Sequence, residues 1–317
     1  RAATMMGAQT LYEPRGETPP IGALRAVKSV TGAMSRPRVV FMFPGQGSQH
    51  PGMARRLYET APAFREALDR CIAVGEKLLD VDLRAWLVTV SPKDDDVAAS
   101  LAETRYAQPA LFSVSYALAA WLDSLGVEPD AMIGHSIGEF AAACHAGVMS
   151  VEDAMRAVIA RGAAMFVQPR GAMLAVRTDA QSVTQLLPSG VEIAAVNAPQ
   201  LTVVAGSAAA LDAFATNLEA RDIGTTKLRV SHAFHSATMD AALPKVAAAL
   251  QRIKLSAPSR TLYSCVSGAP LSAEEATDPQ YWARQVRASV QFSRAVQAEI
   301  AHGNTVFVEV GPGQALT

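Results

Sequence analysis

The sequence lacks several features that would place it in other classes of protein. Of its 317 residues only three are cysteines, and they are the scattered Cys71, Cys144 and Cys265. An odd number of separated thiols provides neither a disulfide framework nor a zinc site, and reduced thiols are typical of the cytoplasm, where we expect the protein to be found. The net charge is only −1, so no overall attraction to nucleic acid or to an anionic membrane is predicted.

Long hydrophobic runs are also absent from the sequence. The longest apolar stretch, Ala107 to Leu122, is interrupted by Pro109 and by polar residues, and it predicts a buried helix and not a membrane span. The first residues do not have the pattern of a signal peptide. Hydrophobic residues nevertheless make up 50% of the chain, which is enough to fill a large core.

The pattern of the chain changes twice. Residues 1–36 mix basic residues, prolines and glycines without periodicity, and we expect a linker or docked extension there, in a chain cut from a longer polypeptide. Residues 170–230 predict the order strand, helix, strand, strand, helix, strand, with the last strand at 227–230. The predicted fold class is α/β. A large α/β-hydrolase-like subdomain with a parallel sheet (residues 37–169 and 231–317) holds an inserted ferredoxin-like small subdomain (residues 170–230).

The interpretation depends on Gly134-His135-Ser136-Ile137-Gly138, which reads G-x-S-x-G. An apolar run precedes this pattern and a plausible helix follows it. Strand, sharp turn and helix are the setting of a nucleophile elbow, which holds a serine hydroxyl clear of the backbone. Ser136 is therefore a candidate nucleophile, and the N–H group of Ile137 is a candidate oxyanion donor. The alternative is an ordinary Gly/Ser turn.

A second glycine-rich loop, residues 44–49, follows a predicted strand at residues 39–43. The loop lacks the lysine of a phosphate-binding P-loop, so the pattern gives phosphate binding little support. It predicts either a simple tight turn or a loop that approaches Ser136 and lends it a backbone N–H group, as a strand-end loop does in α/β-hydrolases.

A base for Ser136 must come from one of six histidines. His135 adjoins the serine, so its side chain points elsewhere and we expect it to line a pocket or to pack. His232 and His235 share a polar loop where the small subdomain returns to the large one, and a cleft between subdomains suits a base. The residues alone leave both open. No acid stands out as a third member of a triad, but a backbone carbonyl can also orient a histidine.

Charged residues in two other places have contrasting interpretations. Arg161 lies in an apolar stretch, residues 157–165, and predicts either a buried anion site or a surface ion pair. Residues 93–96, Lys-Asp-Asp-Asp, have no histidine near them and predict a solvated turn. We therefore expect no metal site.

Five motifs occur in an order that resembles one family. Together they resemble the acyltransferase domains of modular polyketide synthases, and malonyl-CoA:acyl-carrier-protein transacylases in general, from about Val39 to the end of the chain. The motifs are Phe43-Pro44-Gly45-Gln46-Gly47-Ser48-Gln49, Gly134-His135-Ser136-Ile137-Gly138-Glu139, the spacing from there to Arg161, His232-Ala233-Phe234-His235, and Glu309-Val310-Gly311-Pro312-Gly313.

The resemblance implies a role for each matching residue. Ser136 would be the acylated nucleophile and His235 its base. The N–H groups of Gln46 and Ile137 would form the oxyanion hole.

Other roles implied by the resemblance concern the substrate and the base. Arg161 would bind the free carboxylate of the extender unit in bidentate fashion. A backbone carbonyl would replace the acid of a triad, and Gln285 best matches its source. The further residues implied to contact the substrate are Gln108, His135, His232 and Phe234.

The resemblance also implies the reaction. The enzyme would move a malonyl unit from malonyl-CoA to the phosphopantetheine thiol of an acyl carrier protein in two steps, with no metal or redox cofactor. A ketosynthase and other domains of a larger polypeptide would be further partners, while nucleic acid and membranes would not be.

Two sites in the sequence that match the family imply the identity of the extender unit. Ile137 and the His232–His235 loop resemble malonyl-selective members, whereas methylmalonyl-selective members tend to have Gln after the serine and Tyr-Ala-Ser-His in the loop. Phe234 would fill the space that an α-methyl group needs, although a single methyl group is worth only about 1–3 kcal/mol.

Other functions remain open at this point. A serine esterase or thioesterase would explain the elbow but would leave Arg161 and the small subdomain without a role. A catalytically silent docking module would leave Ser136 and His235 unexplained. An acyltransferase selective for another acyl-CoA or carboxyacyl-CoA is a third alternative.

Overall fold

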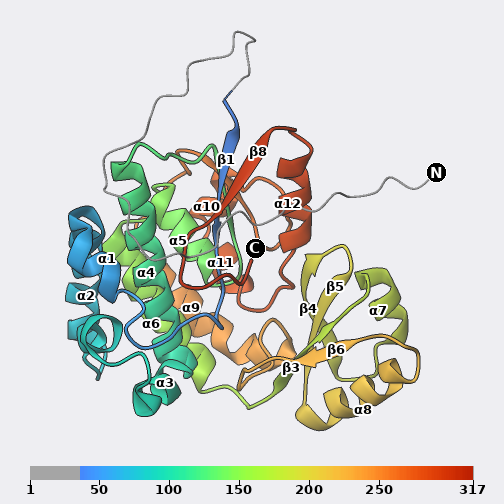
Figure 1. Cartoon of the computed structure of the whole chain (residues 1–317). Coiled ribbons are helices and arrows are strands. Elements are labelled where there is room, and N and C mark those ends of the chain that lie inside the picture. Colours follow the sequence, from blue (N-terminus) through green and yellow to red (C-terminus); the bar gives the residue numbers. More distant parts are fainter. Residues whose placement is uncertain (1–35, 317) are drawn as a thin grey trace, which may run out of the picture. The chain divides into compact units, whose positions relative to one another are not determined.

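A computed structural model of the chain describes residues 36–316 (Figure 1). The chain divides into residues 1–36 and 37–317, and the predicted N-terminal extension lies outside the described residues except for Arg36. None of the helices between residues 36 and 316 combines the length and the hydrophobicity that a membrane span requires.

A four-stranded parallel sheet forms the centre of the larger subdomain. Its order is β7 (Thr261–Tyr263), β2 (Ala131–Gly134), β1 (Arg38–Phe43) and β8 (Thr305–Glu309). The two central strands are largely buried, which explains why both are continuous apolar runs in the sequence. Phe43 pairs with Gly134 at their carboxyl ends, so the loop after β1 and the turn after β2 leave the sheet side by side.

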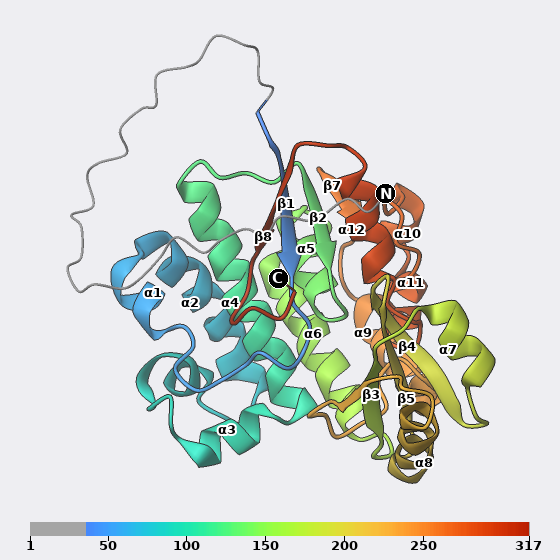
Figure 2. The same ribbon diagram turned by 45° about the vertical axis from the view of Figure 1, so that its right-hand side comes forward.

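Helices surround this sheet. Figure 2 shows β1 and β2 running between α4 on the left and α12 on the right. Helix α4 packs against α2 and α6, and α5 packs against β1 and β2. The helices of this subdomain are α1 (Arg55–Thr60), α2 (Pro62–Leu78), α3 (Asp95–Leu101), α4 (Thr104–Ser124), α5 (Gly138–His145), α6 (Val151–Phe166), α9 (Leu243–Leu250), α10 (Ala273–Thr277), α11 (Pro279–Arg284) and α12 (Phe292–Ile300), with a π-helix at Ala85–Thr89 and a 3-10 helix at Ala237–Ala242.

The second sheet is antiparallel and has the order β4-β5-β3-β6. Its helices pack around a separate hydrophobic core that includes Val176, Val204 and Phe214. Because one helix follows the first strand and another follows the third, the arrangement is ferredoxin-like. The elements of this small subdomain, at the lower right of Figure 1, are β3 (Ala172–Val176), α7 (Ala180–Leu186), β4 (Val191–Ala198), β5 (Leu201–Gly206), α8 (Ala208–Glu219) and β6 (Thr225–Lys227).

The predicted strand at residues 227–230 is wrong in position. Strand β6 ends at Lys227. After one more backbone hydrogen bond, from Leu228 to Met173 of β3 (2.9 Å), the chain leaves the sheet. Leu228 and Val230 line a cavity next to Ser136. Their apolar side chains, which suggested a strand, belong to the wall of this cavity.

The charged run at residues 93–96 is largely exposed, as predicted, and in addition it begins helix α3. The side chain of Asp94 accepts a hydrogen bond from the N–H group of Val97 (3.0 Å) and caps α3. Asp95 and Asp96 lie in the first turn of that helix, where negative charge is favourable.

Candidate active site

Ser136 lies in the sharp turn between β2 and α5. Its φ angle is +51°, in the left-handed region that a residue with a side chain rarely adopts. Gly134 and Gly138 lie so close to neighbouring backbone that neither position has room for a side chain. A Cβ atom on Gly138 would lie 2.1 Å from the carbonyl oxygen of Phe43, and one on Gly134 would lie 2.2 Å from the backbone nitrogen of Glu139. The close packing of strand, turn and helix therefore has the geometry of a nucleophile elbow.

The loop after β1 approaches this turn. The N–H group of His135 donates to the carbonyl of Phe43 (2.9 Å), and a Cβ atom on Gly45 would lie 2.8 Å from Nδ1 of His135. Gln46 and Ile137 line the same cavity as Ser136. Their backbone N–H groups donate to no group among residues 36–316, so both are free to donate to a bound oxygen.

His235 and Ser136 lie in direct contact, although 99 residues separate them in the chain. Nε2 of His235 lies 2.8 Å from Oγ of Ser136, and Nδ1 lies 2.8 Å from the carbonyl oxygen of Ala288. Because a carbonyl can only accept, Nδ1 carries the hydrogen and Nε2 presents its lone pair to the hydroxyl. This is the arrangement in which a neutral imidazole can take a proton from Oγ.

Two backbone carbonyls act on His235, and the predicted one, that of Gln285, is the second of them. The resemblance pointed to the backbone carbonyl of Gln285, but the hydrogen bond goes to Ala288, three residues later. Helix α11 ends at Arg284, and the turn after it brings the later carbonyl to the imidazole. The carbonyl of Gln285 is a second backbone group that raises the pKa of His235.

The surroundings of His235 favour its neutral form. Burial, followed by the positive charge of Arg161 and by His135, lowers its pKa from 6.5 to about 3, and the backbone carbonyls only partly oppose this. At neutral pH the imidazole is therefore uncharged and able to accept a proton.

Arg161, on α6, is completely buried behind Ser136. Its Nη2 donates to Oγ of Ser136 (3.3 Å) and to Oε1 of Gln285 (2.9 Å). Its Nε and Nη1 have no hydrogen-bond partner in the described part of the chain. Burial lowers the pKa of Arg161 to about 10, so the side chain remains a cation at neutral pH. The surface ion pair, the alternative considered above, is excluded, and a buried cation with two unused nitrogens is suited to receive an anion.

Gln285 holds Arg161 in place through its side chain. Its Nε2 donates to the carbonyl of Ser136 (2.6 Å) and to Oε2 of the buried Glu139 (3.1 Å). Tyr281 donates its hydroxyl to the other oxygen of Glu139. Because the acceptors fix the amide nitrogen, the amide oxygen must face Arg161. Glu139 therefore sets the orientation of Gln285, and Gln285 that of Arg161.

The cavity in front of Ser136 has a volume of about 90 Å³ and lies between the two subdomains. Gln108 is buried in its wall, where Nε2 donates to Sδ of Met165 (3.3 Å) while Oε1 has no partner in the described part of the chain. The small subdomain contributes a mainly apolar wall. The residues of that wall are Met173, Ala195, Asn197, Val203, Leu228 and Val230.

Phe234 and His232 are placed differently from one another. Phe234 lines the cavity. His232 is outside the lining, because its Nε2 contacts the carbonyl of Phe166 (3.0 Å) and its Nδ1 contacts Oγ of Ser231 (2.7 Å). The rings of His232 and Phe234 stack with centroids 5.6 Å apart. His232 thus supports the ring of Phe234, and its contact with substrate stays a prediction.

His135 lines the cavity and also connects the subdomains. Its Nε2 lies 2.9 Å from Oδ1 of Asn197 on β4, and its ring lies 5.6 Å from that of Phe292. Burial lowers the pKa of His135, so a neutral ring donates to the Asn197 carbonyl oxygen.

Sequence reasoning missed Ala288, Asn197 and the roles of the Glu139 and Gln285 side chains. Ala288 acts through its carbonyl, which every residue has, so its side chain gives no signal. The one available signal was Glu139, an acidic residue inside the otherwise apolar helix that follows the elbow.

Comparison with known proteins agrees with this geometry. A family model described as "Acyl transferase domain" matches residues 40–317. A phenolphthiocerol/phthiocerol polyketide synthase protein of Mycobacterium tuberculosis is 40% identical over 280 residues, which cover 88% of this chain and 18% of the relative. The chain thus spans less than a fifth of that relative.

Solved structures also match. The acyltransferase domain from the second module of the salinomycin polyketide synthase superposes with a TM-score of 0.82 at 39% identity, covering 89% of this chain and 65% of that one. Malonyl CoA-acyl carrier protein transacylase from Burkholderia pseudomallei gives a TM-score of 0.77 at 28% identity, covering 88% of this chain and 95% of that one. The chain therefore belongs to the acyl transferase domain family, which includes the acyltransferase domains of modular polyketide synthases.

Proposed function

We propose that this domain transfers a malonyl unit from malonyl-CoA to the phosphopantetheine thiol of an acyl carrier protein through an acyl-enzyme on Ser136. The observation that carries the proposal is the buried Arg161, whose Nη2 lies 3.3 Å from Oγ of Ser136 and whose Nε and Nη1 lack partners among residues 36–316. A carboxylate at the end of a short acyl chain on Ser136 would supply the missing acceptors.

In the first half-reaction, Oγ of Ser136 attacks the thioester carbonyl of malonyl-CoA while Nε2 of His235 takes its proton. The N–H groups of Gln46 and Ile137 stabilise the oxyanion of the tetrahedral intermediate. The C–S bond then breaks, and the imidazolium returns the proton to the departing CoA thiolate. The products are malonyl-Ser136 and free CoA.

In the second half-reaction, His235 takes the proton of the phosphopantetheine thiol, whose sulfur attacks the acyl-enzyme. The new C–S bond replaces the C–O bond, and the proton returns to Oγ of Ser136. Pairing of Arg161 with the malonyl carboxylate holds the acyl group in a pose that favours attack by a thiol over attack by water. The reaction as proposed needs no metal or redox cofactor.

The proposed choice of malonyl over methylmalonyl rests on Phe234. Its side chain is 6% exposed and lines the cavity with Ile137, and His232 stacks behind it. Because this support restricts its movement, Phe234 keeps the space next to the α-carbon filled. A selectivity for methylmalonyl is the alternative, and a direct competition between the two thioesters separates them.

The biological setting belongs to the same proposal. Relatives of which this chain covers only 18% favour a domain of a larger cytoplasmic polypeptide, with a ketosynthase and other domains as neighbours. The structural match to a malonyl CoA-acyl carrier protein transacylase over 95% of its length favours an acyl carrier protein as the acceptor.

The decisive experiment measures the intact mass of the protein after incubation with malonyl-CoA. We expect one added malonyl group, and no addition in Ser136→Ala. Labelling of the Ala variant would contradict the assignment of the nucleophile. Rapid loss of the label without a thiol acceptor would favour a serine esterase or thioesterase, and failure to label with any acyl-CoA would favour a silent docking module.

A further inference from the structure

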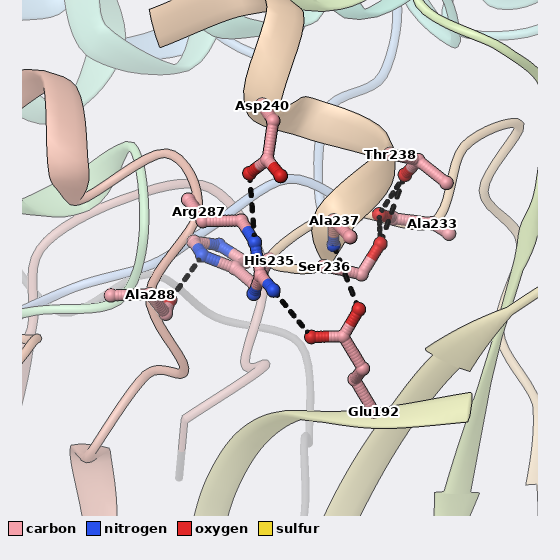
Figure 3. A network of polar contacts seen from close by, with 9 residues as sticks. All are labelled: Glu192, Ala233, His235, Ser236, Ala237, Thr238, Asp240, Arg287 and Ala288. Carbon is pink, nitrogen blue, oxygen red and sulfur yellow. Dashed lines mark hydrogen bonds and ion pairs between the residues drawn. The ribbon is translucent and has the colours of Figure 1, made fainter. Parts of the chain in front are cut away.

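A group of polar contacts connects the small subdomain to both segments that hold His235 (Figure 3). Its centre is Glu192, on β4. Oε1 of Glu192 accepts a hydrogen bond from the N–H group of Ala237 (2.9 Å), two residues after His235. Oε2 pairs with Nη2 of Arg287 (2.6 Å), the residue before Ala288. One carboxylate therefore contacts both the segment that carries the imidazole and the segment that carries its orienting carbonyl.

The segment around Ala288 is attached to the small subdomain in a second way. Val290 exchanges two backbone hydrogen bonds with β4, with N···O distances of 2.9 and 2.8 Å. Nε of Arg287 also pairs with Asp240 (2.9 Å) in the 3-10 helix that follows His235, as Figure 3 shows. The carbonyl of Ala288 thus lies between two attachments to one strand of the small subdomain.

His235 needs support because its own conformation is strained. Its φ angle is +57°, which a residue with a side chain adopts only when its surroundings impose it. Ser236 and Thr238 donate their hydroxyl groups to the carbonyl of Ala233 (2.6 and 2.9 Å) and hold the turn from within. Because those contacts lie inside one turn, they cannot fix the distance between that turn and Ala288. Glu192 contacts Ala237, which follows His235, and Arg287, which precedes Ala288, so it connects the two segments directly.

We propose that Glu192 is a positioning residue that keeps the imidazole of His235 within hydrogen-bonding distance of the carbonyl of Ala288. It thereby couples the placement of the small subdomain to the reactivity of Ser136. The proposal rests on the function proposed above. The side chains of Arg287 and Glu192 are 33% and 37% exposed, and ion pairs of this kind add little to stability. The expected consequence of losing Glu192 is therefore a misplaced base and not an unfolded protein.

Two variants separate the two contacts of Glu192. Glu192→Ala removes both, and Glu192→Gln keeps an acceptor for Ala237 while removing the charge opposite Arg287. We expect the acylation rate at saturating malonyl-CoA to fall about tenfold in the Ala variant, since a misplacement of about 1 Å can cost up to 100-fold. KM should change less than about twofold, because substrate contacts remain, and the Gln variant should recover part of the rate.

Glu128→Ala is the matched control. It removes the partner of Arg260 (2.8 Å), in a pair whose side chains are 62% and 35% exposed. Glu128 precedes β2, whereas Ser136 follows it, so the control should leave acylation unchanged. If the control loses as much rate as Glu192→Ala, or if the losses follow the fall in Tm, the positioning role is refuted.

A second measurement does not depend on turnover. In protein with ¹⁵N-labelled histidine, the wild-type His235 should show a protonated Nδ1 and an unprotonated Nε2, and Glu192→Ala should show averaging between the two tautomers. Unchanged rate and unchanged tautomer in that variant would overturn the inference. If wild-type protein takes no malonyl group, the proposed function fails, and the tautomer signal still decides the role of Glu192.

Discussion

Replacing Arg161 with Met tests the central interpretation, because stability and selectivity should change independently of each other. Arg161 is fully buried, and the methionine side chain is unbranched and apolar. The substitution keeps most of the volume, leaves Ser136 and His235 in place and removes the charge. We expect the variant to be at least as stable as the wild type and to lose its preference for carboxylated acyl groups.

The magnitude follows from the burial of the guanidinium. Its pKa falls from 12.5 to about 10, which corresponds to roughly 3 kcal/mol against the charged form. Methionine removes this cost but leaves Oε1 of Gln285 without its donor, which costs about 1–3 kcal/mol. The free energy of unfolding should therefore stay unchanged or rise by up to roughly 2 kcal/mol. The lost pair with a buried carboxylate is worth about 3–5 kcal/mol, so the preference for malonyl-CoA over acetyl-CoA should fall by a factor between about 10² and 4 × 10³.

Urea denaturation measures the first quantity, and intact-mass competition between malonyl-CoA and acetyl-CoA measures the second. Arg55→Met is the control, because Arg55 donates to the carbonyls of Val88 (2.8 Å) and Thr89 (2.6 Å) and also to that of Val90. The control should lose stability and keep its selectivity. An Arg161→Met protein that is destabilised by several kcal/mol and still prefers malonyl-CoA would refute the reasoning.

Three further changes have outcomes that follow from the structure. Phe234→Ala opens space beside the α-carbon of the acyl group. In a competition measured by intact mass, the preference for malonyl-CoA over methylmalonyl-CoA should fall roughly tenfold, which is what one methyl group contributes in a pocket. An unchanged ratio would show that Phe234 does not determine selectivity. Gly138→Ala places a Cβ atom 2.1 Å from the carbonyl oxygen of Phe43, so it should lower Tm and abolish acylation together, and normal acylation would contradict the tight elbow. Burial lowers the pKa of His135, and it lowers the pKa of His235 to about 3. Below about pH 6.5 the unfolded chain therefore binds more protons than the folded protein does. The free energy of unfolding should therefore decrease as pH falls from 6.5, by up to about 1.4 kcal/mol per pH unit for each histidine. Chemical denaturation at several pH values measures this decrease. A free energy of unfolding that does not change with pH in this range would mean that these rings are exposed.

The sequence was sufficient for the parts of the site that depend on local pattern. The G-x-S-x-G motif between an apolar run and a helix predicted the turn in which Ser136 has its left-handed φ angle. The alternation of strands and helices predicted a ferredoxin-like subdomain because that order is itself the signature. Both inferences need only neighbours in the chain.

Contacts between distant segments were less accessible to sequence reasoning. The residues alone did not separate His232 from His235, since both lie in the same loop and only the tertiary fold brings one of them to 2.8 Å from Ser136. The resemblance implies the carbonyl of Gln285 as the acceptor, whereas Nδ1 of His235 donates to the carbonyl of Ala288, three residues later. The turn after α11 has no side-chain pattern that determines which carbonyl points inward. The strand predicted at residues 227–230 failed for a related reason, since an apolar pair can face a cavity as well as a sheet.

Three unfavourable local features of the described chain meet at Oγ of Ser136. Of the three non-glycine residues with positive φ in this part, two are Ser136 and His235, and such conformations cost about 1–3 kcal/mol each. The third, Asp222, lies in an exposed turn, where aspartate tolerates this conformation. Arg161 adds a buried cation with unused donors. Because all three unfavourable groups face the same reacting oxygen, a substitution that relieves any of them should stabilise the fold and weaken the reaction, which is the opposing response predicted for Arg161→Met.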